Sequence, residues 1–168
     1  MSATASTQAT PMGPFTSMLA ADGAVLACGW TTRLDDLRAV VHPSLRPADV
    51  RWTEDSGEVT EAVRRYFAGE LAAIDAVPVR QHSGEFLRRA WEVLRTVPPG
   101  APITYTEYAA KAGRPKAVRA AGSACARNAV ALIVPCHRVL PAGGAPGDLR
   151  RVPPTKRWLL AHEAAECS

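Results

Sequence analysis

The sequence predicts an α+β fold in two parts: a small domain of sheet and helices at residues 1–79 and a mainly helical domain at residues 80–168. Short apolar runs separated by turn residues come first, and apolar residues at helical spacing dominate later. The charge also changes sign along the chain. Residues 1–79 hold 6 Lys/Arg and 10 Asp/Glu, whereas residues 80–168 hold 14 and 6. With 168 residues, 47% of them hydrophobic, the chain can bury a core.

The first domain is predicted from local patterns. Its first ten residues are polar and uncharged, so we expect a frayed tail and no signal peptide there. Two apolar runs within residues 13–30 flank Asp22-Gly23, which is the strongest short-range signal of a β-hairpin. A helix is expected at residues 35–41. A longer helix is expected at residues 56–69, where apolar side chains recur at helical spacing until a glycine ends the pattern.

The second domain follows a linker at residues 78–83 and is predicted to be mainly helical. The expected helices cover residues 86–94, 107–112, 115–126 and 155–166. Thr106 is the expected N-cap of the second of these helices, and Pro115 suits the first turn of the third. Because a glycine turn joins these two helices, they form a helix-turn-helix candidate. Residues 129–134 form a short apolar run that indicates a buried strand.

Composition excludes several classes of protein. The four cysteines are widely spaced with no C-x-x-C pair, which argues against a disulfide framework and a zinc cluster, so we expect reduced thiols, no metal and a cytoplasmic protein. No stretch reaches the roughly 18 apolar residues of a membrane span, so no membrane partner is expected. The net charge is +4, concentrated in the second half, and favours a polyanionic partner such as nucleic acid. A chance excess of arginine is the alternative interpretation.

The segment Ile133-Val-Pro-Cys-His-Arg-Val139 contains the sharpest chemical feature. Cys136 ends an apolar run and His137 follows it directly. Cysteine reacts as the thiolate, which a nearby base or positive charge promotes near neutral pH. The dipeptide alone is also compatible with a buried cysteine beside a surface histidine.

The helix expected at residues 115–126 has a basic face surrounded by small residues. Residues at spacings of three and four share this face, and they are Lys116, Arg119, Ser123 and Arg127. The small neighbours, including Ala120, allow close approach to another surface, which suits sequence-independent docking to a DNA backbone or minor groove. The alternative is an alanine-rich core helix with a solvated basic edge. In the same way, Trp158-Leu-Leu-Ala-His-Glu163 alone indicates only an amphipathic helix.

Together these segments form a specific pattern. The order is Y-x-x-x-A, R-A-x-G-x-A, N-x-x-x-x-x-x-P-C-H-R-V and W-L-L-A-H-E. This pattern resembles the O6-alkylguanine-DNA alkyltransferases, also called methylated-DNA–protein-cysteine methyltransferases. The resemblance is firm over residues 83–163 and weaker in the first half, where GPF and YFAGEL match. It implies a ribonuclease-H-like N-terminal domain and a winged-helix-like C-terminal domain that holds both the DNA face and the active site.

The resemblance also implies roles for particular residues. Cys136 matches the nucleophile that accepts the alkyl group, His137 the base that is reached through a water, and Glu163 the residue that orients this base. Tyr105 matches a tyrosine that donates a proton as the guanine leaves. Asn128 matches an asparagine that tethers the recognition helix to the cysteine segment.

Further roles concern DNA and the alkyl pocket. Arg119 matches an arginine finger that fills the gap left by a flipped base, which would make the partner double-stranded DNA with alkylated guanine, read from the minor groove. Lys116, Ser123 and Arg127 are candidate phosphate contacts. A thioether does not hydrolyse, so the resemblance implies that each molecule reacts once. It also implies that the protein needs no cofactor and acts as a monomer. The substrate is O6-alkylguanine, with O4-alkylthymine as a further candidate.

The alkyl pocket is where this sequence departs from the pattern. Val134 and Pro135 precede the nucleophile and match one side of the pocket. The other wall is the loop at residues 147–154, where relatives carry an aromatic residue and glycines. Here Leu149 stands at the tyrosine position and Arg150 at the small polar one. This departure keeps a non-catalytic lesion-binding relative as an alternative, beside a helix-turn-helix transcription factor and a cysteine hydrolase.

Overall fold

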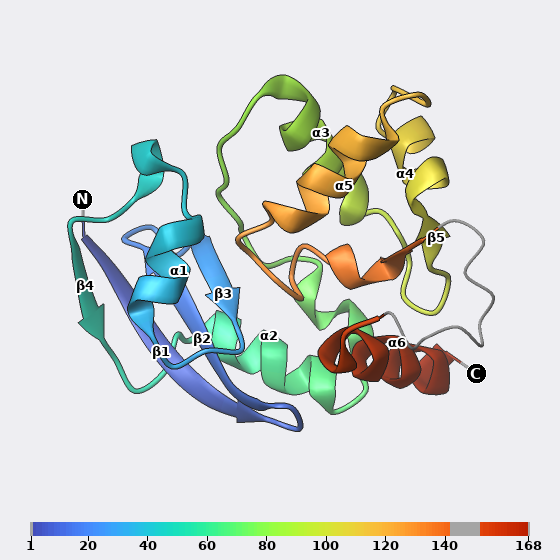
Figure 1. Cartoon of the computed structure of the whole chain (residues 1–168). Coiled ribbons are helices and arrows are strands. Elements are labelled where there is room, and N and C mark those ends of the chain that lie inside the picture. Colours follow the sequence, from blue (N-terminus) through green and yellow to red (C-terminus); the bar gives the residue numbers. More distant parts are fainter. Residues whose placement is uncertain (1, 142–151, 168) are drawn as a thin grey trace. The chain divides into compact units, whose positions relative to one another are not determined.

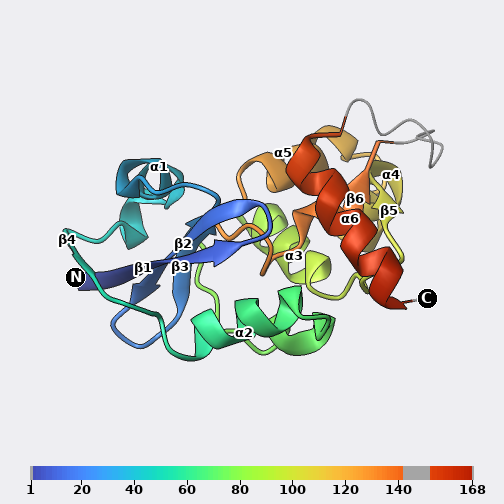
Figure 2. The same cartoon turned by 90° about the horizontal axis from the view of Figure 1, so that it is seen from below.

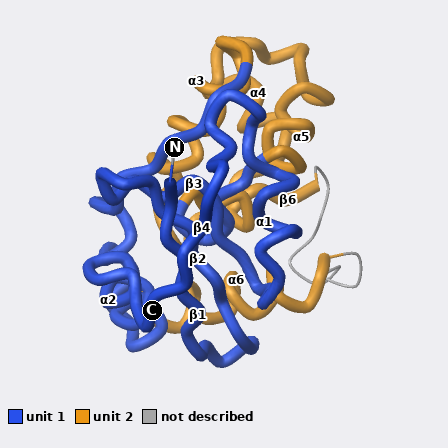
Figure 3. Tube along the Cα trace, turned by 90° about the vertical axis from the view of Figure 1, so that its left-hand side faces the viewer, with its two compact units in different colours: residues 1–83, 128–133 blue, residues 84–127, 134–168 orange. Residues whose placement is uncertain are grey.

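A computed structural model describes residues 2–141 and 152–167 and confirms the α+β class (Figure 1). The chain divides into two compact units, coloured separately in Figure 3. The first unit comprises residues 1–83 and 128–133, and the second comprises residues 84–127 and 134–168. None of the helices in the described part of the chain is long and apolar enough to span a membrane.

A four-stranded sheet forms the centre of the first unit. Its strands are β1 (Ser2–Thr10), β2 (Gly13–Ala20), β3 (Val25–Gly29) and β4 (Asp49–Trp52), in the order β3-β2-β1-β4. The first three strands are antiparallel, whereas β4 runs parallel to β1. The predicted hairpin at Asp22-Gly23 is confirmed between β2 and β3, and Gly23 adopts a φ of 92° that suits glycine in this turn.

The expectation of a frayed N-terminal tail is wrong, because residues 2–10 form β1, an interior strand of the sheet. It pairs with β2 along its whole length, from Ala3 opposite Ala20 to Thr10 opposite Gly13. Most of its side chains are small, and Ala3, Ala5 and Ser6 are buried. Threonine favours strands, but a segment of Ser, Thr and Ala carries no strong apolar alternation. Its partners therefore stabilise this strand more than its own sequence does.

Two helices cover opposite sides of this sheet in Figure 2: α1 (Leu34–Val40) and α2 (Glu58–Phe67). Both were predicted within a few residues, and Gly69, with a φ of 110°, follows the end of α2. Short 3-10 turns at Pro43–Leu45 and Leu71–Ile74 complete the unit.

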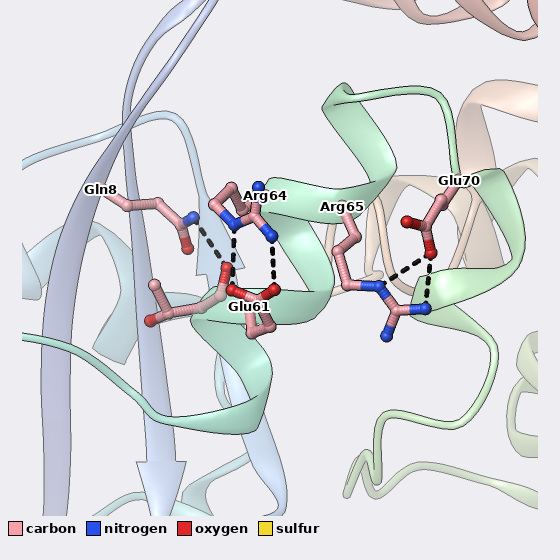
Figure 4. Close-up of polar contacts among 6 residues, drawn as sticks. Gln8, Glu61, Arg64, Arg65 and Glu70 are labelled. Atoms are coloured by element: carbon pink, nitrogen blue, oxygen red, sulfur yellow. Dashed lines mark hydrogen bonds and ion pairs between the residues drawn. The ribbon is translucent and has the colours of Figure 1, made fainter.

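A side chain of β1 donates to the backbone of helix α2, and the helix also carries exposed ion pairs (Figure 4). The side-chain amide of Gln8 in β1 donates to the carbonyl of Thr60 at 3.1 Å. On the exposed face, Arg64 pairs with Glu61 and Arg65 pairs with Glu70, both at 2.5 Å. Exposed pairs of this kind contribute little to stability, so the apolar face of α2 is what holds the helix in place.

The second unit is mainly helical. Its helices are α3 (Glu85–Leu94), α4 (Tyr105–Lys111), α5 (Val118–Ala126) and α6 (Pro154–Cys167). Two buried hydrogen bonds join the first three helices. The indole of Trp91 donates to the carbonyl of Ala124 at 2.8 Å, and the hydroxyl of Tyr108 donates to the carbonyl of Ala90 at 2.7 Å. The predicted helix-turn-helix of α4 and α5 is therefore anchored on α3.

Two predictions of helix starts are wrong by a few residues. Thr104 rather than Thr106 is the N-cap of α4, because Thr104 and Glu107 form a reciprocal capping box. Pro115 does not open the first turn of α5, which begins at Val118, but lies in the turn before it.

The apolar run at residues 129–134 is buried, as predicted, but it is not a strand of either sheet. It makes one isolated bridge, between Val130 and Cys28, and then turns. Leu132 is 1% exposed and adopts a φ of 74°, which is uncommon for a residue other than glycine. The burial of this segment explains why its sequence is apolar. The turn at Leu132 explains why the segment does not form the continuous hydrogen bonds of a β-strand.

Candidate active site

Cys136 begins a single 3-10 turn, Cys136–Arg138, directly after the buried residues Val134 and Pro135. The turn leads into β6 (Val139–Leu140), which pairs in parallel with β5 (Ile103–Thr104). Cys136 is partly exposed, whereas the two residues after it are buried. The local fold therefore leaves this cysteine at the surface and places its neighbours in the protein interior.

Glu163 of α6 connects those two buried neighbours. One of its oxygens lies 2.8 Å from Nε2 of His137. The guanidinium of Arg138 donates from Nε at 3.0 Å and from Nη2 at 2.9 Å, one bond to each carboxylate oxygen. Arg138 also donates from Nη1 to the carbonyl of Val97 at 2.8 Å. Glu163 is 0% exposed and Arg138 is 2% exposed, so a complete ion pair is enclosed here.

This pairing defines the protonation of His137. Burial, as the largest cause, lowers the pKa of His137, although the Glu163 carboxylate acts in the opposite direction. The imidazole is therefore neutral near neutral pH. With Nε2 donating to the carboxylate, Nδ1 is left as an unprotonated acceptor. Nδ1 is buried and has no hydrogen-bond partner among the described residues. A neutral histidine with a free Nδ1 is a suitable proton acceptor.

A second group of side chains surrounds Tyr105, the first residue of α4. Lys156 of α6 places its ammonium 5.8 Å from the centre of the Tyr105 ring and donates to the carbonyl of Val139 at 2.6 Å. Burial, followed by the charges of Cys125 and Cys136, raises the pKa of Tyr105 to about 12. Burial likewise lowers the pKa of Lys156. The phenol thus remains protonated and can act as a hydrogen-bond donor.

The candidate DNA-binding residues lie on and beside α5. Arg119 and Ser123 are exposed and four residues apart within the helix. Lys116 and Arg127 are exposed as well, but they flank the helix rather than belonging to it. Ala120 is partly exposed between them. The spacing of three and four residues in the sequence therefore identified a set of side chains that are exposed on one short segment.

The remaining predicted residues have different surroundings. Asn128 belongs to the first unit, where its Oδ1 accepts from the amide of Gln81 and from the backbone of Val130, both at 3.0 Å. Val134 and Pro135 are buried beside Cys136 in the chain. Leu149 and Arg150 lie outside the described residues.

Three residues of this region could not be assigned from the sequence. Arg138 stood there only as part of a motif, yet it completes the pairing of Glu163. Lys156 and Cys125 belonged to no sequence motif that indicated a role, and only the folded chain places them near Tyr105. Arg138 could have been suspected, because a glutamate on the apolar side of a helix requires a buried cationic partner.

Comparisons with known proteins identify relatives of this chain. Residues 85–165 match the profile of the DNA-binding domain of 6-O-methylguanine DNA methyltransferase. A methylated-DNA–protein-cysteine methyltransferase of Salmonella typhimurium is 32% identical over 161 residues, which cover 92% of each chain. A protein of the same name from Shigella flexneri is 39% identical over 107 residues, which cover 64% of this chain and 63% of that protein.

A solved structure gives the corresponding likeness in three dimensions. The crystal structure of Mycobacterium tuberculosis OGT in complex with DNA superposes with a TM-score of 0.71 at 29% identity. The match covers 97% of this chain and 94% of that chain. The likeness therefore extends over both units of the fold.

Proposed function

Because the chain belongs to the family of methylated-DNA–protein-cysteine methyltransferases, we propose that it repairs alkylated DNA directly by transferring the alkyl group of O6-alkylguanine to Cys136. One observation carries this proposal. A partly exposed cysteine directly precedes a buried neutral histidine, which a glutamate holds in one tautomer. The relatives are named for alkyl transfer from DNA to a cysteine, and this arrangement supplies the nucleophile and the base for that reaction.

The nucleophile is activated by proton transfer to His137. The thiol proton of Cys136 passes through a water to Nδ1, while Nε2 keeps its hydrogen bond to Glu163. The imidazolium that forms is stabilised by the buried carboxylate, which is the same logic as in the cysteine and serine hydrolases. Arg138 fixes this carboxylate in place, because it donates a hydrogen bond to each of its oxygens.

The alkyl group is then transferred from the guanine oxygen to the sulfur of Cys136. The thiolate forms the S–C bond as the C–O6 bond breaks, and the electron pair of that bond remains on the guanine. Tyr105 donates a proton to the departing base, for which its protonated phenol is suited. The product is a thioether on Cys136, which water does not cleave, so each molecule reacts once.

DNA is bound through the exposed side of α5 in the minor groove. Arg119 fills the space that the flipped nucleotide leaves in the duplex. Extrusion of the nucleotide costs a few kcal/mol, which the contacts between protein and DNA offset. Lys116, Ser123 and Arg127 contact phosphates. We also propose that the two units are ribonuclease-H-like and winged-helix-like, that the protein acts as a monomer, and that it is cytoplasmic.

The test uses duplex DNA that contains one O6-methylguanine. After incubation and digestion, the peptide with Cys136 should gain about 14 Da, the mass of one methylene, in a single turnover. Cys136→Ala should gain nothing, whereas Cys167→Ala, which removes an exposed cysteine, should react like the wild type. Tight binding to the lesion without a mass gain would instead favour a non-catalytic lesion-binding protein. Turnover of an acyl substrate would favour a hydrolase, and a sequence-specific footprint on undamaged DNA a transcription factor.

A further inference from the structure

The outer edge of β3 is covered by two segments that come from different parts of the chain. Residues 78–80 pair with Val25 and residues 129–131 pair with Cys28, through backbone hydrogen bonds between 2.8 and 3.3 Å long. All of these residues belong to the first unit. A hydrogen bond between two side chains joins the end of the first segment to the start of the second.

Gln81 and Asn128 form this bond, and two backbone amides fix its direction. The amide of Ala129 donates to Oε1 of Gln81 at 3.0 Å, and the amide of Val130 donates to Oδ1 of Asn128 at 3.0 Å. Both oxygens thus face backbone donors, so Nε2 of Gln81 is the group that donates to Oδ1 of Asn128, also at 3.0 Å. Gln81 therefore binds Ala129 directly and reaches Val130 through Asn128.

We propose that Gln81 is a positioning residue for the transfer: it fixes the side-chain amide of Asn128 in one orientation and thereby holds the segment that joins α5 to Cys136. This inference rests on the proposed function. In the chain, Asn128 follows the C-cap residue of α5, and the mostly buried residues 129–135 lead from it to Cys136. Gln81 acts through Asn128 and touches neither the alkyl group nor the base.

The orientation of the Asn128 amide decides whether this segment keeps its hydrogen bonds. A side-chain amide has an accepting end and a donating end, and a half-turn exchanges them. After such a turn, the donating end of Asn128 would face two other donors, the amide of Val130 and Nε2 of Gln81. The bond from Gln81 adds one neutral hydrogen bond to the observed orientation, which favours it about two- to tenfold.

Hydrogen exchange at single backbone amides of the DNA-free protein tests the arrangement without any transfer. In Gln81→Ala, the amide of Val130 should exchange about two- to tenfold faster, although its acceptor belongs to Asn128 and not to the substituted side chain. The amide of Ala129 should also exchange faster, because it loses its own acceptor. An unchanged exchange rate at Val130 would overturn the inference.

Gln81→Glu separates the two bonds that Gln81 makes. The carboxylate still accepts from the amide of Ala129 but cannot donate to Asn128, so only the amide of Val130 should exchange faster. The amide of Ala131, which donates to a carbonyl of β3, should keep its wild-type rate in both variants. Equal acceleration at Ala129, Val130 and Ala131 would indicate a general loosening of the segment and would overturn the positioning role.

The rate constant of methyl transfer at saturating duplex DNA with one O6-methylguanine measures the effect on the reaction. Gln81→Ala and Gln81→Glu should both slow transfer about two- to tenfold. The duplex concentration for half-maximal rate should stay unchanged, because the lost contact lies within the protein. Gln8→Ala is the matched control, because it removes another glutamine of the first unit, which donates to a backbone carbonyl of α2, and it should react like the wild type. A wild-type rate for Gln81→Ala would contradict the proposal.

The same substitution in an Asn128→Ala background shows whether Gln81 acts through Asn128. Once the Asn128 amide is absent, Gln81→Ala should have little further effect on the rate. An equal slowing in both backgrounds would overturn the inference. A wild-type protein that transfers no methyl group would overturn the proposed function itself, whereas the exchange rate at Val130 would still report on Gln81, so the two failures are distinguishable.

Discussion

Arg138 and Glu163 form a bidentate ion pair that is almost completely enclosed, with side-chain exposures of 2% and 1%. A buried pair of this kind does not add stability simply by its charges, because both ions have lost their hydration. The loss of one partner is nevertheless costly, because the other charge then remains in the interior without compensation.

Arg138→Met should therefore destabilise the protein by about 3–5 kcal/mol, since Glu163 would lose both hydrogen bonds that the guanidinium donates to its carboxylate. Urea unfolding followed by circular dichroism measures this change. Arg64→Met is the matched control, because Arg64 forms an exposed pair with Glu61 and its loss should leave the free energy of unfolding nearly unchanged. Similar losses for both variants would contradict the buried pairing.

His137→Asn should slow methyl transfer about 10²–10⁴-fold, which is the usual contribution of a general base. The Arg138–Glu163 pair is retained in this variant, so duplex binding should be unchanged. In the wild type, the rate should fall as pH decreases below the ordinary histidine range, because burial lowers the pKa of His137 and the base is lost only when it is protonated. Quenched-flow transfer assays measure both effects. A rate within threefold of the wild type would exclude His137 as the base.

The same histidine should make stability depend on pH. In the unfolded chain it binds a proton near pH 6.5, whereas in the folded protein burial shifts its pKa lower. Between these two values the unfolded state holds more protons, so the free energy of unfolding decreases as pH falls below about 6.5. Unfolding curves between pH 7 and pH 5 should show this slope, and it should be weaker in His137→Asn. Parallel curves for the two proteins would argue against a neutral buried imidazole.

Substitution of each of two neighbouring threonines tests which residue is the N-cap of α4. Thr104→Ala removes the side chain that accepts from the backbone of Glu107 and should cost about 0.5–2 kcal/mol. Thr106→Ala changes an exposed residue in the first turn and should be near neutral. Thermal unfolding distinguishes the two, and the reverse order would restore Thr106 as the cap.

The salt dependence of DNA binding tests the basic segment. If Lys116 contacts a phosphate, Lys116→Ala should make the plot of log K against log salt shallower by about one unit. Arg33→Ala, an exposed arginine of the first unit, should leave the slope unchanged. Fluorescence anisotropy with a lesion-free duplex measures this. Equal slopes for Lys116→Ala and the wild type would remove Lys116 from the interface.

Local signals in the sequence were sufficient for the hairpin at Asp22-Gly23 and for helix α2, because the turn residues and the apolar spacing lie within the elements themselves. They were insufficient for β1. That strand pairs with residues 13–20 across a short turn and with residues 49–52 far along the chain. Its own Ser, Thr and Ala residues show no apolar alternation, and the distant pairing leaves no local pattern.

The candidate site divides in the same way. The motif around Cys136 and the distant Glu163 could be identified through resemblance, and the structure brings His137 and Glu163 into contact. The pairing of Arg138 with Glu163 spans 25 residues and depends on how α6 returns to the 3-10 turn. No spacing rule predicts such a contact.

The position of β1 inside its sheet has a consequence for the order of assembly during synthesis. The ribosome makes β1 before the other strands of this sheet, and β2 can pair with it as soon as residue 20 has emerged. Its other edge stays open until the chain up to Trp52 is available, because β4 covers that edge. A nascent chain in this interval displays a strand edge rich in threonine and serine rather than aliphatic residues. Such an edge lacks the large apolar side chains that make a long exposed strand edge prone to aggregate.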